Sequence, residues 1–240
     1  MKQCPVSDMK LIINGDDLGY TLANTYGIIE AYQNGILRST TALTNSRYIR
    51  EAAECTKGLE GLGIGVHLTL TLGEALTDNK TLTDENGYFF KGPVTVFQHG
   101  PDYGEIYAEW KAQIERFIEV FGRMPTHLDS HHSVHDRTPE ALKVSKRLAE
   151  EYGLPLRGYN PFTFVRDFNS HNGTTVEKLK EILIDHKDEN IEIMCHPGYC
   201  DLELYRQSSN SLNRVVELDV LCSDEIREFI KDNGIELVHY

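Results

Sequence analysis

Short apolar runs alternate with helix-patterned segments along almost the whole chain, and this alternation limits the possible folds more than any other feature. Seven runs have the length and character of strands, at residues 10–14, 36–44, 64–71, 126–130, 155–158, 191–195 and 235–239. Segments with helical spacing of apolar residues separate them, at residues 23–33, 48–57, 105–121, 139–152, 176–186, 212–221 and 223–232. Strands that alternate with helices predict a parallel sheet, here an α/β fold with a distorted, TIM-like barrel.

The length of the chain favours a single domain. With 240 residues, of which 40% are hydrophobic, the chain can bury one large core, so we expect one domain over residues 1–240. The segment from residue 73 to 104 is rich in Thr, Gly, Asp and Asn and is long for a connection. We therefore expect this segment to be a loop that contacts substrate.

Composition and charge exclude several classes of partner. The net charge of −13 and the absence of clustered Lys and Arg argue against a nucleic-acid ligand. Residues 1–10 have no apolar signal core, and no stretch approaches the ~20 apolar residues of a membrane span, so we expect a cytoplasmic protein. Five cysteines at irregular spacing predict reduced thiols, although Cys195 and Cys200 flank His196 and leave a zinc site as an alternative.

Histidines are concentrated in one short stretch. Residues 127–135 read His-Leu-Asp-Ser-His-His-Ser-Val-His and hold four of the ten histidines of the chain. Imidazole and carboxylate are the groups that divalent metals take from proteins, so the stretch predicts a catalytic metal ion. A solvated loop or a tag remnant is the alternative, but tags sit at chain termini and this stretch lies mid-chain.

Ionisable groups recur where predicted strands end. Asp16 and Asp17 follow the first strand, His67 lies in the third, the histidine stretch follows the fourth, and His196 follows the sixth. Each alone has an ordinary explanation as a helix cap, a core histidine or a turn. Because catalytic groups of parallel α/β folds gather at the carboxyl ends of strands, their coincidence predicts one active site.

Five motifs together resemble a known family. They read Asn-Gly-Asp-Asp-Leu-Gly, Tyr-Gly-Ile-Ile-Glu-Ala, Ser-Thr-Thr-Ala-Leu-Thr, Gly-Val-His-Leu-Thr and Thr-His-Leu-Asp-Ser-His-His-Ser-Val-His, at residues 14–19, 26–31, 39–44, 65–69 and 126–135. In this order they resemble the YdjC-like carbohydrate deacetylases, which include chitooligosaccharide deacetylase. The resemblance is looser after residue 135, where residues 155–157 and 196–198 still match. It implies a barrel-like α/β fold, hydrolysis of N-acetyl groups on amino-sugar oligosaccharides, and a homodimer.

The resemblance also assigns roles to residues. It implies that Asp17, His67 and His131 bind one divalent ion, Mg²⁺ or Zn²⁺. Asp16 matches the general base, and His196 falls where related polysaccharide deacetylases keep a general acid. The chemistry agrees, since amide hydrolysis needs an activated water, a stabilised oxyanion and an acid for the departing amine.

Other polar residues are assigned less directly. We expect His132 and Asp129 to contact substrate or to support the site, with plain structural hydrogen bonding as the alternative for each. Arg157, at another strand end, is expected to orient Asp16 or the sugar, with a surface salt bridge as the alternative. For His127 and His135 we prefer the structural interpretation. Arg214 and Glu217, three apart on a predicted helix, are expected to form a local ion pair.

Ser133 and Leu18 stand where relatives often have His and Phe, which leaves substrate contacts undetermined.

Three other functions remain open from the sequence. A metal-dependent phosphoesterase uses the same residue types, but usually with two ions and more ligands. A sugar isomerase would need more carboxylate ligands, and a sugar-binding module would not need Asp16 and His196 beside a metal.

Overall fold

The described residues form one parallel β-sheet. The structure is a computed structural model that describes residues 9–92 and 94–240. Its strands are β1 (Lys10–Leu18), β2 (Ser39–Ala42), β3 (Gly63–Leu68), β4 (Leu128–Ser130), β5 (Thr163–Val165), β6 (Ile191–Cys195) and β7 (Glu236–Val238). They pair in the order β4-β3-β2-β1-β6-β5, and β7 pairs with the first residues of β1. Because all these pairs are parallel, the carboxyl ends of the strands lie along one edge.

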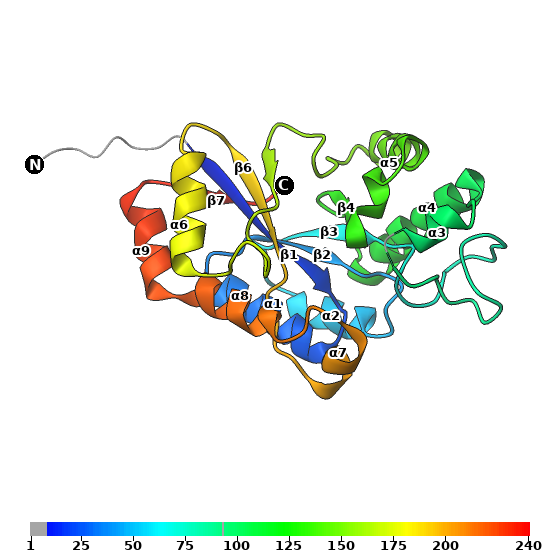
Figure 1. The fold of residues 1–240 in the computed structure, drawn as a ribbon, viewed down its shortest axis with the longest axis horizontal. Coiled ribbons are helices and arrows are strands. Elements are labelled where there is room, and N and C mark those ends of the chain that lie inside the picture. The colour runs from blue at the N-terminus through cyan, green and yellow to red at the C-terminus, as the bar shows by residue number, and fades with distance from the viewer. Residues whose placement is uncertain (1–8, 93) are drawn as a thin grey trace, which may run out of the picture.

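Helices cover the outer face of this sheet. The helices of the described residues are α1 (Leu22–Gln33), α2 (Ile49–Thr56), α3 (Thr95–Gln98), α4 (Tyr103–Phe121), η1 (His131–Asp136), α5 (Pro139–Tyr152), α6 (Val176–Asp185), α7 (Leu202–Gln207), α8 (Asn213–Cys222) and α9 (Asp224–Asp232). Neighbouring helices contact one another in the order α5, α4, α2, α1, α8, α9 and α6, a layer that follows the strands (Figure 1). None of the described helices is both long enough and apolar enough to cross a membrane.

The two faces of the sheet differ in chemistry. The face toward the helices carries apolar side chains of the hydrophobic core, among them Leu11, Ile13, Ile64, Val66, Ile191 and Ile193. The opposite face carries buried polar side chains, among them Asn14, Asp16, Thr41, His67, Asp129 and Glu192. Branched apolar residues usually fill the interior of such barrels. Here the interior is polar, and the candidate site is built on it.

The α/β fold with a distorted barrel is confirmed, but the barrel stays open. β4 and β5 end the sheet, and beside β4 the chain forms only one parallel bridge, between Leu128 and Leu156. The strand predicted at 155–158 is therefore wrong, because the chain turns away at Gly158, whose φ of 76° is left-handed. On the side away from β1, β6 is bordered by β5, which the sequence pattern does not predict.

Other differences concern short elements. The sequence pattern does not predict α3, η1 or α7, each of which has only six residues or fewer. β1 extends beyond the predicted range 10–14, so Asp16 and Asp17 belong to the strand itself. Residues 1–8, which hold Cys4 and most of the stretch expected to lack a secretory signal, lie outside the described residues.

Candidate metal centre

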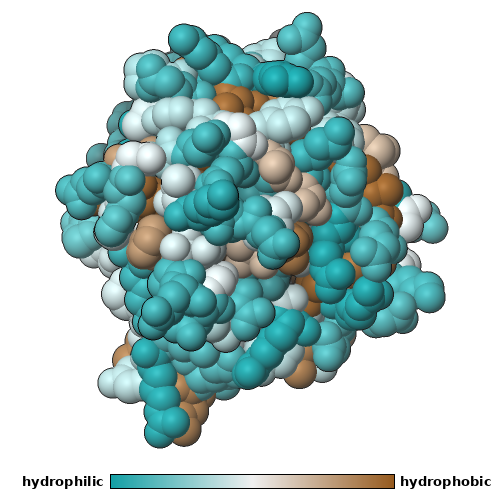
Figure 2. Space-filling model, turned by 90° about the vertical axis from the view of Figure 1, so that its right-hand side faces the viewer, coloured by the Kyte–Doolittle hydropathy of each residue, from teal (hydrophilic) through white to brown (hydrophobic). Residues whose placement is uncertain are grey.

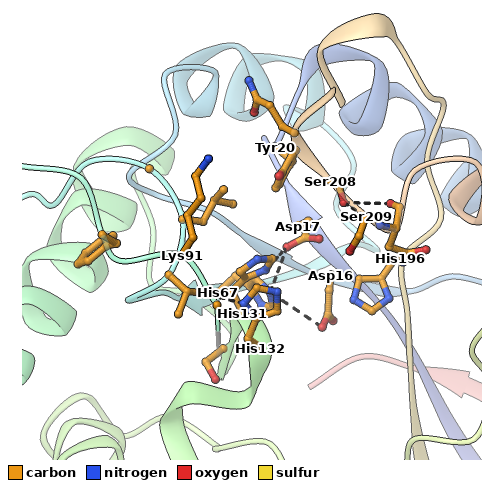
Figure 3. Close-up of a pocket in the computed structure, with 18 of the residues that line it drawn as sticks. Asp16, Asp17, Tyr20, His67, Lys91, His131, His132, His196, Ser208 and Ser209 are labelled. Carbon is orange, nitrogen blue, oxygen red and sulfur yellow. Dashed lines mark hydrogen bonds and ion pairs between the residues drawn. The ribbon is translucent and has the colours of Figure 1, made fainter. Parts of the chain in front are cut away.

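An irregular end of β1 turns two consecutive aspartates toward one cavity. In a regular strand Asp16 and Asp17 would point to opposite faces. Instead the pairing with β2 shifts register between Gly15 and Leu18, and Asp17 has a left-handed φ of 74°. This conformation costs about 1–3 kcal/mol in a non-glycine residue. Asn24 donates to the carbonyl oxygen of Asp17 at 2.9 Å and helps to hold it. Both carboxylates therefore line the cavity (Figure 3).

Asp17, His67 and His131 bring three donor atoms together (Figure 3). Oδ1 of Asp17 lies 3.2 Å from Nε2 of His67 and 2.9 Å from Nδ1 of His131. The three ligand atoms all lie within 4.8 Å of one another. One carboxylate and two imidazoles are a donor set for a divalent ion, and three protein ligands leave positions for water and substrate. The residues therefore fit a catalytic metal ion.

Asp129 orients His67 from the side away from the cavity. Oδ1 of Asp129 lies 2.6 Å from Nδ1 of His67, and Oδ2 accepts from Thr41 at 2.9 Å. A carboxylate in this position fixes a metal-binding imidazole and directs Nε2 toward the ion. Burial disfavours the charged imidazole, but the charges of Asp129 and Asp16 outweigh it and raise the pKa of His67 to about 10. Metal binding therefore requires His67 to release a proton.

Arg157 joins three strands beneath the donor atoms. Its Nη1 and Nη2 donate to the Asp16 carboxylate at 2.9 and 2.8 Å, and its Nε donates to Glu192 at 2.7 Å. Nη1 also lies 2.8 Å from Oδ2 of Asp129. Arg157 and Asp129 are buried and do not line the cavity. Of the two roles expected for each residue, this placement favours support of the site over substrate contact, because Arg157 holds Asp16 and Asp129 holds His67.

A second group of possible donors is a poorer metal site. It consists of Asp16, His67 and Asp129. Both of its carboxylates already form ion pairs of 2.8 Å with Arg157. A metal ion bound there would lie beside the guanidinium and be repelled by it. The group around Asp17 is the better candidate.

The turn that carries His196 is fixed by two helices. A Cβ on Gly27 would lie 2.4 Å from Cα of Gly198, so α1 contacts this turn backbone to backbone. On α8, Glu217 accepts from the backbone N–H of His196. The imidazole of His196 lines the cavity beside Asp16 (Figure 3). Burial lowers the pKa of His196 to about 4, so the ring is neutral at pH 7 before substrate binds.

Arg214 contacts the carboxylate of the metal site, which corrects its expected pairing with Glu217. Nη2 of Arg214 donates to Oδ2 of Asp17 at 2.6 Å. Glu217 bonds the turn at His196 instead. Burial alone would raise the pKa of Asp17, but the charges of His131 and Arg214 hold that pKa well below its ordinary value. Arg214 is thus a site residue that the sequence analysis missed.

The spacing of residues along α8 is a signal that could have identified Arg214 and Glu217 as site residues. Arg214, Glu217, Leu218 and Leu221 follow the spacing i, i+3, i+4, i+7 and share one face of α8. All four are at most 5% exposed, whereas the two valines after Arg214 are 40% and 46% exposed. Two charged residues on the apolar side of a helix indicate positions that serve a site rather than the surface.

The donor atoms line a cavity of about 840 Å³. This volume lies within the usual range of small-molecule sites. Residues from the part of segment 73–104 between 73 and 92 form one wall, among them Asp84, Tyr88, Phe89, Phe90 and Lys91. A loop that contacts substrate, as expected for this segment, would lie in this position. His132 also lines the cavity, whereas His127 and His135 are buried away from it, in keeping with structural roles.

The alternative zinc site around His196 is not supported. Sγ of Cys195 faces the carbonyl oxygen of Asn14, and Sγ of Cys200 faces that of Asp201. Within the described part of the chain, the donor groups that could hold a metal include neither cysteine.

The architecture of the chain is shared with a distantly related solved structure. A family 4 carbohydrate esterase from Streptomyces lividans superposes with a TM-score of 0.57 over 96% of this chain and 92% of that chain, at 10% identity. This shows a shared fold alone. The family described as YdjC-like protein matches residues 10–232. The chain belongs to the YdjC-like family.

Similar proteins align over nearly their whole length. Carbohydrate deacetylase 2 of Listeria innocua is 39% identical over 247 residues, which cover 97% of this chain and 98% of the relative. Chitooligosaccharide deacetylase of Escherichia fergusonii is 37% identical over 248 residues, with 96% and 97% covered. A crystal structure from Enterococcus faecalis V583, named for cellobiose-phosphate cleavage, has a TM-score of 0.90 at 38% identity and covers 98% of both chains.

Proposed function

We propose that this protein is a metal-dependent hydrolase that removes N-acetyl groups from amino-sugar oligosaccharides. The observation that carries this proposal is the convergence of Asp17, His67 and His131, with Asp16 and His196 facing the same cavity. These groups match the needs of amide hydrolysis. Membership of the YdjC-like family and the names of the relatives support the same chemistry.

We assign the metal to Asp17, His67 and His131. Asp17 is preferred to Asp16 because both histidines approach Oδ1 of Asp17, whereas Nε2 of His67 lies 4.0 Å from Asp16. Two nitrogen ligands favour Zn²⁺ or another transition ion over Mg²⁺, which prefers oxygen. Such an ion would polarise an acetyl carbonyl and make water more acidic.

Asp16 accepts the proton of the attacking water in this proposal. Its carboxylate lies beside Asp17 at the cavity, and both of its oxygens are held by Arg157. Two parallel N–H···O bonds from a guanidinium fix the orientation of a carboxylate. Arg157 is therefore a positioning residue for the base.

His196 protonates the departing amine. It is neutral at pH 7 because burial lowers its pKa to about 4. Negative charge that develops on the acetyl oxygen favours the charged imidazole, so His196 takes up a proton from solvent as the reaction proceeds, and Asp16 afterwards releases the proton of the attacking water to solvent. Glu217 fixes the backbone at this residue, which keeps the ring in place.

The rival activities fit the site less well. A two-metal phosphoesterase needs a second donor set, but the second group in the described residues has both carboxylates paired with Arg157. A sugar isomerase would need free carboxylates at the same position. A binding module gives no reason for Asp16 to be held so firmly beside a metal site.

An acetate-release screen tests the proposal. Purified protein is stripped of metal, reloaded with Zn²⁺, Mg²⁺ or no metal, and incubated with N-acetylated mono- and oligosaccharides. We expect equal amounts of acetate and free amine from an oligosaccharide, and only with metal. Phosphate release from phosphorylated sugars without acetate would instead favour the phosphoesterase.

The homodimer and the cytoplasmic location remain predictions. Exposed apolar side chains gather on and beside α7 and α8, and such surfaces often mark an interface between subunits; they are Leu202, Tyr205, Leu212, Val215 and Val216. This surface supports the homodimer. Light scattering of the purified protein measures its mass directly, and the mass of a monomer at micromolar protein concentration would contradict the homodimer.

A further inference from the structure

A second cavity adjoins the one at the metal site. Its volume is about 440 Å³. The two cavities share five lining residues, Tyr20, Leu72, Gly73, Tyr88 and Gln207. A ligand with more than one ring can therefore extend from the metal site across this shared wall.

The charges of the second cavity are balanced. Arg47, on its wall, donates to both carboxylate oxygens of Glu203 at 2.7 Å. Arg116, also on the wall, lies 3.7 Å from Glu119. The other carboxylate on the wall, Glu74, is hydrogen-bonded by Tyr88. Because each cation already has a carboxylate beside it, an anionic group gains little there. The cavity suits an uncharged polar ligand.

Tyr88 gives the shared wall an aromatic face. Its side chain is 48% exposed, although it lines both cavities. Its backbone pairs with Glu74 in an antiparallel bridge. Tyrosine combines a flat apolar ring with a polar end, and sites for small ligands use such rings to pack against apolar ligand faces. The C–H face of a sugar ring matches this surface.

The segment that presents Tyr88 is fastened to α4. Glu109 accepts from the backbone N–H groups of Leu76 and Thr77 at 2.9–3.1 Å. One turn earlier, Glu105 accepts from two further backbone N–H groups, those of residues 80 and 81. One turn later, Gln113 bonds both backbone groups of residue 69. The wall is preformed, so a ligand does not have to order it.

The surrounding surface also favours a small polar ligand. The face of the molecule that carries segment 73–104 is mostly hydrophilic, with small scattered hydrophobic areas (Figure 2). A large apolar partner would find little to cover there.

We propose that the second cavity is a subsite for an uncharged sugar ring, joined to the N-acetylated ring at the metal site and packed against Tyr88. This inference rests on the proposed function and adds to it where the second ring of the oligosaccharide binds and which side chain contacts that ring. Tyr88 then determines the preference for chain length. It acts on binding of the second ring and not on the chemistry at the metal.

Calorimetric binding to zinc-loaded protein tests the subsite. Asp16→Asn serves as the background, because it should slow hydrolysis during the titration. We expect N,N′-diacetylchitobiose to bind more tightly than N-acetylglucosamine. Tyr88→Ala should weaken disaccharide binding by roughly 3–10-fold, the range for an aromatic contact, and weaken monosaccharide binding clearly less, although Tyr88 also borders the metal-site cavity. Tyr88→Phe should retain the preference.

Tyr26→Ala is the matched control, since Tyr26 is 52% exposed and lines neither cavity. It should bind both sugars like the background. Equal weakening of both sugars by Tyr88→Ala, or no weakening of either, overturns the subsite but leaves the proposed function standing. If neither sugar binds to the background and wild-type protein releases no acetate, the proposed function itself is overturned.

Discussion

Arg214 on α8 donates to Oδ2 of Asp17 at 2.6 Å, while Oδ1 of the same carboxylate faces His67 and His131. One oxygen of the carboxylate thus contacts the guanidinium, and the other contacts the two imidazoles. Arg214 is 2% exposed and Asp17 is fully buried, so the charge of Asp17 is compensated by Arg214 together with His131 when no metal is present. A bound metal would take over part of that compensation.

Arg214→Met should therefore destabilise the metal-free protein by about 3–5 kcal/mol, the usual cost of breaking a buried pair. Metal should recover part of this loss, because the ion neutralises Asp17. We expect the metal-induced rise in Tm to be larger in the variant than in wild type, with Arg214→Lys in between. Thermal unfolding with and without Zn²⁺ measures it, and equal rises in all three proteins would refute the compensation.

Asp16→Asn should keep the fold and the metal but lower kcat by roughly 10²–10⁴, the usual contribution of a general base. Asp129 and Glu192 remain as anionic partners of Arg157, so the interior should not collapse. Steady-state kinetics and metal analysis on the same preparation check this. Near-normal turnover would make Asp16 a structural residue only.

His196→Ala should separate two kinds of substrate. An amine leaves a tetrahedral intermediate only when protonated, whereas an activated aryl ester leaves without help. We expect nearly complete loss of N-acetyl hydrolysis and much smaller loss toward 4-nitrophenyl acetate. Equal losses on both would assign His196 to oxyanion stabilisation instead.

Glu217 should make stability depend on pH. Burial raises the pKa of Glu217 to about 7, above its ordinary value of 4.5. The folded state then holds this proton more tightly, so the stabilisation is complete below pH 4.5 and is lost as pH rises through 7. The shift corresponds to an effect on the order of 3 kcal/mol.

Urea unfolding of wild type and Glu217→Gln between pH 4.5 and pH 8 measures this effect. The free energy of unfolding of wild type should decline relative to that of the variant across the range. Parallel curves would show that the Glu217 carboxyl has an ordinary pKa.

Much of the fold follows from local patterns in the sequence. The alternation of strands and helices predicts the parallel sheet, and parallel strands bring Asp16, Asp17, His67 and His196 to one edge. The open barrel is harder to foresee, because one bridge at Leu156 replaces a strand that the apolar run suggested.

The contacts that the sequence leaves undecided join distant segments of the chain. Arg214 lies 197 residues from Asp17, and Arg157 lies 141 residues from Asp16. Each arginine has an ordinary local interpretation, as a helix ion pair or a surface residue. The register shift in β1, which turns both aspartates to one side, also forms only against β2.

The most direct test of the central claim compares bound metal with acetate release in wild type, His67→Ala and His131→Ala. His171→Ala is the control, because His171 is exposed and does not line the metal-site cavity. We predict about one ion per chain in wild type and control, with metal and acetate release lost together in both site variants. Full metal content in the two variants, or acetate released at the wild-type rate without metal, would contradict the account.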